Sequence, residues 1–466
     1  MLGKHAFQVI NEKRNEFTDL ALRIWNNPEP SWREVQACQW TAEYLEANGF
    51  IVERNYVGLK TAIHAVWGEG KPEIGFCGEY DALPNLSQDN TVSYKKPMEG
   101  QNYGHACGHN ILGVANVAAV IGLKSEMELR GLKGTIHFYG TPAEEAMDGK
   151  GFMVRNGAFR ELDTAIFFHP GSENVALNNT MLACMALDFH YTGITAHASA
   201  APYNGRSALD AVELCNVGVN YLREHVTPDV RMHYIITDGG TSANTVPGKA
   251  SSHYIIRAMS RETLKDVEER VRAVANGAAM MTGTSVEIVC TGACYNTLNM
   301  TSLAKILDQS LRETPHEGWD ENDLELARQM NHTVPGMYDK MIQMLGIEHG
   351  TELFEGVSTI KTGIGSASGD PGDVMNLVPS ISFMTACAPI TAPPHTWQMC
   401  CAAGNEIGMK GMIYAAKTMA LYSLKLISDP DILKHANEEF LNKKKGKKYI
   451  NSVSDDRVVP YSDQIN

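Results

Sequence analysis

Apolar residues recur at helical spacing in some segments and in short continuous runs in others, which predicts helices and strands respectively. Helical spacing extends from Phe7 to Ile24, and Pro28 and Pro30 then interrupt it. The next segment, Ser31-Trp32-Arg33-Glu34, has the pattern of a capping box, so we expect a second helix that ends near Asn48-Gly49.

Strands and helices then alternate along the chain. We expect strands at residues 51–56, 62–67, 74–77, 135–139 and 164–168, and helices over residues 111–124 and 151–156. This alternation is typical of an α/β fold, in which helices flank both faces of a largely parallel sheet.

The pattern changes near residue 187. We expect a strand at 187–192, a helix over 207–223, strands at 231–237 and 252–258, a helix over 261–281 and a strand at 285–290. Two strand-helix-strand units in so short a stretch predict a small α+β domain inserted into the first.

After the insertion the chain is expected to return to the first domain, with a strand at 380–385 and a helix over 408–427. The predicted organisation is therefore a catalytic domain in two parts, 1–186 and 297–435, with 187–296 inserted between them. Residues 436–466 are expected to form a polar C-terminal tail, which contains the basic run from Lys443 to Lys448.

Composition narrows the classes of partner. With 44% hydrophobic residues and a formal net charge of −14, the chain can form a large core, and its surface would repel nucleic acid and anionic membranes. We find no run of about twenty uncharged apolar residues, and the first residues lack a signal-peptide pattern. The ten cysteines are scattered rather than regularly spaced. A soluble cytoplasmic protein is predicted.

Candidate chemistry gathers where predicted strands end. In an open α/β sheet, ligands bind beyond the carboxyl ends of the strands. Four predicted strands lead into side chains that can bind a metal or transfer a proton: Glu79 and Asp81, Glu144 and Glu145, His169, and His395. Their convergence predicts a site at that edge of the sheet.

A glycine-rich loop supplies a fifth element. In Gly104-His105-Ala106-Cys107-Gly108-His109-Asn110 the glycines permit a tight turn, and Asn110 can cap the apolar helix that follows. Cys107 and His109 could chelate a cation from this one loop, and a helix N-terminus would favour the thiolate. Sulfur with imidazole suits zinc, whereas carboxylate oxygens keep manganese or cobalt open.

Two adjacent acidic residues are expected to have different roles. Glu144 and Glu145 cannot point the same way, so one is expected to bind metal while the other transfers a proton. For isolated histidines such as His64 and His137, the default is a structural or surface role.

Taken together, these motifs resemble those of the aminoacylase and carboxypeptidase family of co-catalytic metallopeptidases, in its Cys-containing amidohydrolase branch. The resemblance extends from the first helix to about Ser423. It is carried by Glu79-Tyr80-Asp81-Ala82-Leu83-Pro84, the Cys107 loop, Pro142-Ala143-Glu144-Glu145, His169-Pro170, Ala196-His197-Ala198, Gly205-Arg206-Ser207-Ala208-Leu209-Asp210-Ala211 and His395-Thr396-Trp397-Gln398.

The resemblance implies two divalent metal ions, with Glu144 as the general base and Asp81 orienting a ligand. The implied ligands are Cys107, His109, Glu145, His169 and His395.

The inserted domain would then be a dimerisation lid. His197 would stabilise the oxyanion, often in the neighbouring subunit, and Asn244 and Arg257 would hold the substrate carboxylate. The loop Ser368-Gly369-Asp370-Pro371-Gly372-Asp373 departs from the family pattern and should border the substrate.

The predicted function is dinuclear metal-dependent hydrolysis of an amide bond to an amino acid, with N-aroyl or N-acyl amino acids as substrates. A homodimer is expected, and pairing with a homologous subunit is an alternative. The competing functions are a general N-acyl-amino-acid deacylase or dipeptidase, a non-catalytic partner subunit, and a redox role for Cys107.

Overall fold

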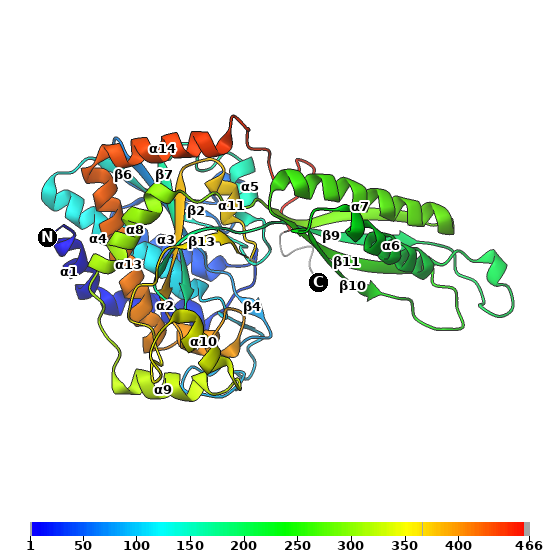
Figure 1. Cartoon of the computed structure of the whole chain (residues 1–466), viewed down its shortest axis with the longest axis horizontal. Helices are drawn as coiled ribbons and strands as arrows, with labels where there is room; N and C mark the ends of the chain where they lie inside the picture. Colours follow the sequence, from blue (N-terminus) through cyan, green and yellow to red (C-terminus); the bar gives the residue numbers. More distant parts are fainter. Residues whose placement is uncertain (1, 366, 461–466) are drawn as a thin grey trace.

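The computed structural model describes residues 2–365 and 367–460, and a large sheet organises most of them (Figure 1). Its eight strands lie in the order β1-β2-β6-β3-β7-β14-β8-β13. They are β1 (Ile51–Arg54), β2 (Ile63–Glu69), β3 (Glu73–Gly78), β6 (Gly134–Gly140), β7 (Thr164–Gly171), β8 (Val175–Thr180), β13 (Lys361–Ile364) and β14 (Ser380–Ala386). The central strands β6, β3, β7 and β14 are mutually parallel. The predicted α/β fold with a largely parallel sheet is confirmed.

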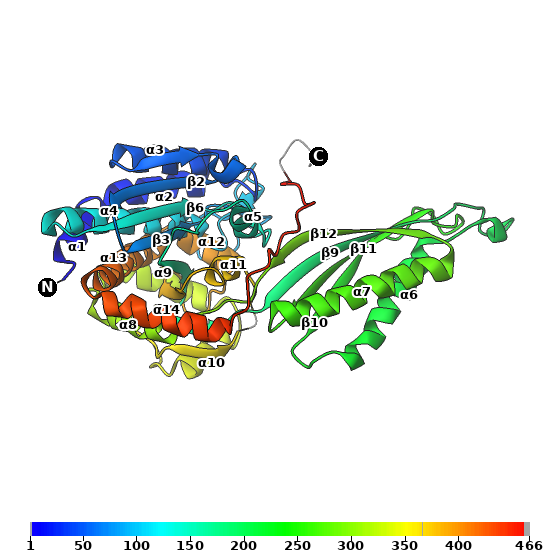
Figure 2. The ribbon, with the colours of Figure 1, turned by 90° about the horizontal axis from the view of Figure 1, so that it is seen from above.

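Alternate residues of the central strands face two separate cores. Phe76, Phe138 and Ile166 belong to the larger core, whereas their sequence neighbours Cys77 and Tyr139 belong to the smaller one. The larger core includes residues of α1 (Lys4–Glu12), α2 (Arg14–Asn26), α3 (Val35–Ala47), α4 (His109–Arg130), α8 (Thr301–Glu313), α12 (Trp397–Ala403) and α13 (Glu406–Ser428). The smaller core includes residues of α5 (Gly149–Arg155) and α11 (Pro371–Met375). Helices therefore cover both faces (Figure 2).

The N-terminal region differs from the prediction in two places. The single helix expected over Phe7–Ile24 is divided at Lys13 into α1 and α2. The predicted capping box is wrong, because the Glu34 side chain makes no cap hydrogen bond and points into the core. Instead, the Glu29 carboxylate accepts the backbone N–H groups of Gln36 and Ala37 at the start of α3.

A second, antiparallel sheet projects from the body of the molecule, as Figure 1 shows. Its strand order is β10-β11-β9-β12. The strands are β9 (Ala183–Thr192), β10 (Arg231–Asp238), β11 (Lys249–Ala258) and β12 (Ser285–Cys294), and α6 (Ala208–Leu222) and α7 (Arg261–Thr282) pack against them. This unit has a hydrophobic core of its own.

The remaining elements complete the body. They are the short pair β4 (Leu83–Pro84) and β5 (Tyr103–Gly104), and the helices α9 (Glu321–Asn331), α10 (Met337–Leu345) and α14 (Pro430–Lys444). The helix α14 occupies the beginning of the predicted polar tail, and Tyr449 beyond it donates a hydrogen bond to Asp373 at 2.6 Å. Residues 461–466 of that tail lie outside the described residues. Within the described residues, every helix is too short or too polar to cross a membrane.

Candidate metal centre

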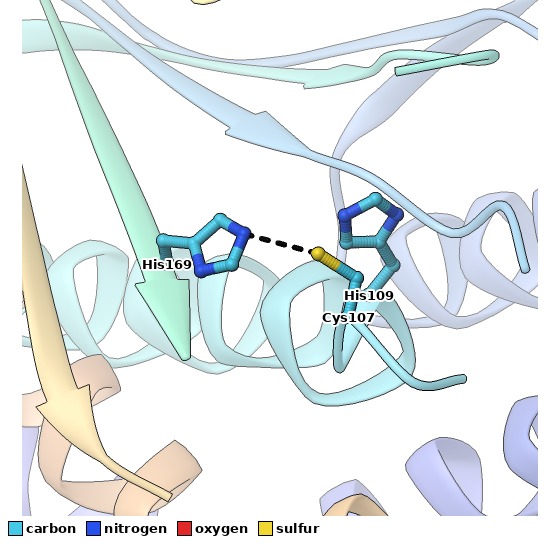
Figure 3. A group of neighbouring side chains, drawn as sticks. All are labelled: Cys107, His109 and His169. Atoms are coloured by element: carbon cyan, nitrogen blue, oxygen red, sulfur yellow. Dashed lines mark hydrogen bonds between the residues drawn. The ribbon is translucent and has the colours of Figure 1, made fainter. Parts of the chain in front are cut away.

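Cys107, His109 and His169 meet at the carboxyl edge of the parallel sheet (Figure 3). Cys107 lies two residues before the start of α4 and His169 lies near the end of β7, with the Cys107 Sγ and His169 Nε2 atoms 3.3 Å apart. Gly108 has a φ of 76°, a conformation that favours glycine, and a Cβ there would lie 2.7 Å from the end of the Met399 side chain. The prediction that Asn110 caps α4 is wrong, because its side chain donates to the Ala403 carbonyl instead.

A second group shares the same cysteine. Cys107, Glu145 and His395 lie close together, with His395 Nε2 3.4 Å from Glu145 Oε2. In each group the potential ligand atoms all lie within 4.8 Å of one another. The structure thus brings the five residues predicted as ligands into two triads joined at Cys107. Their ligand role stays a prediction.

Hydrogen bonds orient the imidazoles toward the centre. His109 Nδ1 lies 2.9 Å from Asp81 Oδ1, and His169 Nδ1 lies 2.7 Å from the Pro170 carbonyl oxygen. Each acceptor holds a proton on Nδ1, so Nε2 is the ring atom directed at Cys107 and its neighbours. His109 Nε2 and Glu145 Oε1 are buried without a hydrogen-bond partner among the described residues. Such buried acceptors fit a divalent cation.

The pKa shifts of Cys107 and Asp81 are consistent with a bound cation. Burial raises the pKa of the Cys107 thiol, although the nearby His109 opposes the shift, so a thiolate here needs cationic charge beside it. Burial also acts to raise the pKa of Asp81, but its hydrogen bond with His109 lowers that pKa to about 2. Asp81 is therefore ionised and can orient His109, and its role beside a metal ligand stays a prediction.

Glu144 occupies a different environment from Glu145. Burial and the nearby carboxylates of Glu79 and Asp370 raise the pKa of Glu144 well above its ordinary value. Its Oε2 lies 3.9 Å from His109 Nε2. Burial raises the pKa of Glu145 to about 7. A carboxyl group with a raised pKa beside a metal-type cluster can accept and release a proton near neutral pH.

Two buried carboxyl groups hold the backbone on either side of Glu144. Glu34 Oε1 accepts the Ala143 N–H at 2.8 Å, and Asp81 Oδ2 accepts the Glu145 N–H at 2.9 Å. Ala143 has a φ of 55°, a strained conformation for a residue with a Cβ. Sequence reasoning missed the role of Glu34, because a helix-capping pattern explained its position equally well.

A buried lysine was also missed. Lys150 Nζ lies 2.6 Å from Glu79 Oε1 and 2.7 Å from Asp370 Oδ1, and its side chain is fully buried. The other oxygen of Glu79, Oε2, lies 3.4 Å from His109 Nε2. Lys150 thus offsets part of the negative charge that surrounds Glu144. The sequence holds no signal for this contact, which joins three distant segments.

The loop that departs from the family pattern borders the same site. A Cβ at Gly369 would lie 2.7 Å from Glu144 Oε1, so a larger residue there would displace that carboxylate. Next to this glycine, Ser368 accepts a hydrogen bond of 3.2 Å from Arg257 Nε. The predicted carboxylate anchor Arg257 therefore lies close to the loop.

His197 and Asn244 lie elsewhere. Both are exposed near the end of the second sheet that is farthest from Cys184, and Ala198 donates its N–H to the Asn244 carbonyl. The ten residues of β9 separate them from the body, a length of roughly 30 Å. Within one chain, the structure does not bring these two residues to the Cys107 triads. Their predicted contacts with substrate would require a neighbouring subunit.

The chain is similar to known proteins in sequence and in fold. Residues 184–280, within the projecting unit, match the family model described as a peptidase dimerisation domain. The chain is 37% identical over 448 residues to the B subunit of p-aminobenzoyl-glutamate hydrolase from Escherichia coli (strain K12), and the match covers 92% of this chain and 93% of that protein. The sequence motifs indicate a resemblance to this B subunit, and the match confirms that resemblance.

Two further proteins extend the comparison. The Xaa-Arg dipeptidase of Mus musculus is 28% identical over 97% of this chain and 95% of its own. The crystal structure of a dinuclear metal-binding peptidase from the M20 family of Bacillus subtilis superposes with a TM-score of 0.58 at 17% identity, over 90% of this chain and 99% of that one. The similarity to the Bacillus subtilis structure shows that the two chains share a fold.

Proposed function

The chain belongs to the M20 peptidase family and is a metal-dependent amidohydrolase, and from this premise we propose that it cleaves the amide bond of N-aroyl amino acids of the p-aminobenzoyl-glutamate type. The observation that carries the reaction class is the pair of triads joined at Cys107, with Glu144 beside them. The identity of 37% with the hydrolase B subunit, against 28% with the dipeptidase, favours the aryl amide over a dipeptide.

The ions would be held by the two triads, through Cys107, His109 and His169 on one side and Cys107, Glu145 and His395 on the other. When bound, two such cations supply Lewis acidity toward the scissile carbonyl and lower the pKa of a coordinated water. We propose two Mn²⁺ or Zn²⁺ ions, with Co²⁺ as a substitute, because the donor set combines sulfur, imidazole and carboxylate.

Glu144 is the general base in this proposal. Its carboxylate takes the proton of the attacking water and returns it to the departing amine. Gly369 leaves room for that carboxylate, and the bonds from Glu34 and Asp81 to the flanking backbone hold it in place.

Arg257 would hold the carboxylate of the product amino acid. From a partner subunit, His197 would donate to the oxyanion and Asn244 would assist at the substrate carboxylate. Within this chain, His197 Nδ1 accepts the N–H of Ala200 at 3.1 Å, which leaves the proton on Nε2 and makes that atom a donor. The distance of His197 and Asn244 from the triads of their own chain, with the match to a peptidase dimerisation domain, supports a homodimer formed through the projecting unit. Pairing with a homologous subunit is the alternative.

A cytoplasmic location fits the many unpaired cysteines.

The test is a hydrolysis assay with the purified chain alone after reconstitution with Mn²⁺ or Zn²⁺. Substrates are p-aminobenzoyl-glutamate, its α-methyl ester, N-acetyl-glutamate and an Xaa-Arg dipeptide. We expect the first to have the highest kcat/KM and the ester to raise KM sharply. No turnover by the metal-loaded chain would favour a non-catalytic partner subunit, and a higher kcat/KM for the acetyl or dipeptide substrate would favour the deacylase or dipeptidase.

A further inference from the structure

Two histidines that the catalytic centre does not use face each other on neighbouring strands. His64 on β2 and His137 on β6 lie on one face of the sheet, with His64 opposite Tyr139 in the antiparallel register. The His64 Nε2 and His137 Nδ1 atoms are 3.0 Å apart. The backbones of both residues are fixed by the pairing of β2 with β6.

A carboxylate from a third segment completes a triad. Glu161, in the connection between α5 and β7, places Oε1 3.8 Å from His64 Nε2 and 3.9 Å from His137 Nδ1. Ligand atoms around a tetrahedral zinc ion lie roughly 3.3 Å apart, given metal–ligand distances of about 2.0–2.1 Å. Shifts well under an ångström would therefore bring these three atoms around one ion.

The surroundings of the triad match those of metal ligands. His137 Nε2, the nitrogen that points away from the triad, lies 3.2 Å from Glu73 Oε2, close enough for an electrostatic contact but outside hydrogen-bond geometry. The Tyr139 hydroxyl donates to Glu161 Oε1 at 2.5 Å. A carboxylate behind a ligating imidazole, and a donor on a ligating carboxylate, are the contacts that orient metal ligands in proteins.

The charge state of the imidazoles also suits a ligand role. Burial lowers the pKa of His64 to about 4, and it lowers the pKa of His137 as well. Both rings are neutral at neutral pH, and neutral imidazole is the form that binds metal. Glu161 is partly exposed, with about a third of its side chain open to solvent, which gives an ion a route of entry.

We propose that His64, His137 and Glu161 form an additional metal site, separate from the Cys107 triads, that takes one divalent transition-metal ion such as Zn²⁺. Water would complete the coordination sphere. The ion would join β2 to β6 and to the turn before β7, which is a structural role. It shares no ligand with the catalytic centre, so the two sites can be emptied independently.

The absorption spectrum of bound Co²⁺ can distinguish the two sites, because a thiolate ligand gives a charge-transfer band that nitrogen and oxygen ligands do not give. The test starts from chelator-treated protein titrated with Co²⁺ and then Zn²⁺, with metal per chain measured by mass spectrometry. In Cys107→Ala we expect that absorption to vanish while the visible bands of a nitrogen- and oxygen-bound cobalt ion remain. Adding His64→Asn to Cys107→Ala should remove one equivalent of cobalt.

Glu161→Gln in the Cys107→Ala background weakens the same site from a partly exposed position, so it covers the case in which His64→Asn unfolds. His190→Asn, at an exposed position on β9, is the matched control and should change nothing. Identical cobalt uptake in Cys107→Ala with and without His64→Asn or Glu161→Gln would overturn the proposal and leave the pair as hydrogen-bonded histidines. That result would not touch the proposed hydrolase activity, which is measured separately on the wild-type chain.

Discussion

Glu34 Oε1 accepts a 2.8 Å hydrogen bond from the backbone N–H of Ala143, the residue before the proposed general base. The same oxygen accepts the Trp32 N–H at 2.8 Å, and Oε2 accepts the Thr61 hydroxyl at 2.9 Å. One fully buried side chain thereby joins the N-terminal helices, the turn before β2 and the loop that carries Glu144. This contact holds the backbone from which Glu144 projects.

Two replacements of Glu34 should show whether its hydrogen bonds or its ionisable group matter for activity. In Glu34→Gln the amide oxygen can still accept both backbone N–H groups while its NH₂ donates to Thr61, so we expect kcat within a few-fold of wild type. Glu34→Ala leaves buried donors unpaired, at about 1–3 kcal/mol each, and should lower both kcat and the free energy of unfolding. Urea titrations and steady-state kinetics on both variants provide the measurement. Equal losses in the two variants would argue against positioning by hydrogen bonds.

Glu144→Gln should lower kcat by about 10²–10⁴-fold, because it removes the proton acceptor while leaving the metal-type cluster intact. Metal content per chain should equal that of the wild type. The matched variant is Glu145→Gln, whose side chain belongs to the triad with His395, and it should lose metal. Near-normal turnover in fully metal-loaded Glu144→Gln would refute the assignment of the base.

The sharing of Cys107 by both triads predicts unequal metal losses. We expect His395→Ala to lose one ion from the catalytic centre and Cys107→Ala to lose both, because only the cysteine belongs to each set. Cys38→Ala, at another buried cysteine, is the control and should keep the wild-type content. Metal analysis after exhaustive dialysis distinguishes these cases, and equal losses in the first two variants would speak against a bridging thiolate.

Lys150→Met should destabilise the protein strongly. The variant leaves Glu79 and Asp370 buried without their cation, and a broken buried pair costs about 3–5 kcal/mol. Lys71 contacts two carboxylates in the same way but is largely exposed, so Lys71→Met should cost about 1 kcal/mol or less. Denaturant unfolding of the two variants side by side measures the difference, which should disappear if the Lys150 pairs contribute no more than surface pairs.

Stability should fall in acid partly through His64. Burial and the neighbouring His137 lower its folded-state pKa to about 4 from an ordinary value of 6.5, while Glu161 opposes the shift. Because the folded-state pKa is depressed, the stabilisation is complete above pH 6.5 and is lost as the pH falls through 4. The contribution is on the order of 3 kcal/mol. His64→Gln in metal-free protein should flatten this part of the pH profile of unfolding, whereas His190→Gln should leave it unchanged.

Much of the fold and the grouping of the candidate metal ligands could be predicted from local patterns. Short continuous runs of apolar residues identified the strands of the parallel sheet, because a strand that is buried on both faces needs apolar residues at successive positions. The metal-type side chains Cys107 and His169 follow such runs or precede an apolar helix, and parallel strands end at one edge. Their convergence therefore follows from the chain order itself.

Hydrogen bonds between distant segments could not be predicted in this way. Glu34 has a helix-start pattern in sequence, yet in the structure it lies against Ala143; Asn110 looks like a cap, yet it bonds to Ala403. Lys150 looks like an ordinary surface lysine until Glu79 and Asp370 enclose it. These partners lie far away along the chain, and local spacing carries no information about them.

The sequence by itself determined which side chains are available for chemistry and which edge of the sheet they reach, because strand direction and residue type are local properties. Only the tertiary structure decided that Cys107 joins two triads, that two buried carboxyl groups hold the Glu144 loop, and that His197 lies far from its own catalytic centre. Those relationships depend on which buried polar groups satisfy one another once water is excluded, and that is settled by packing.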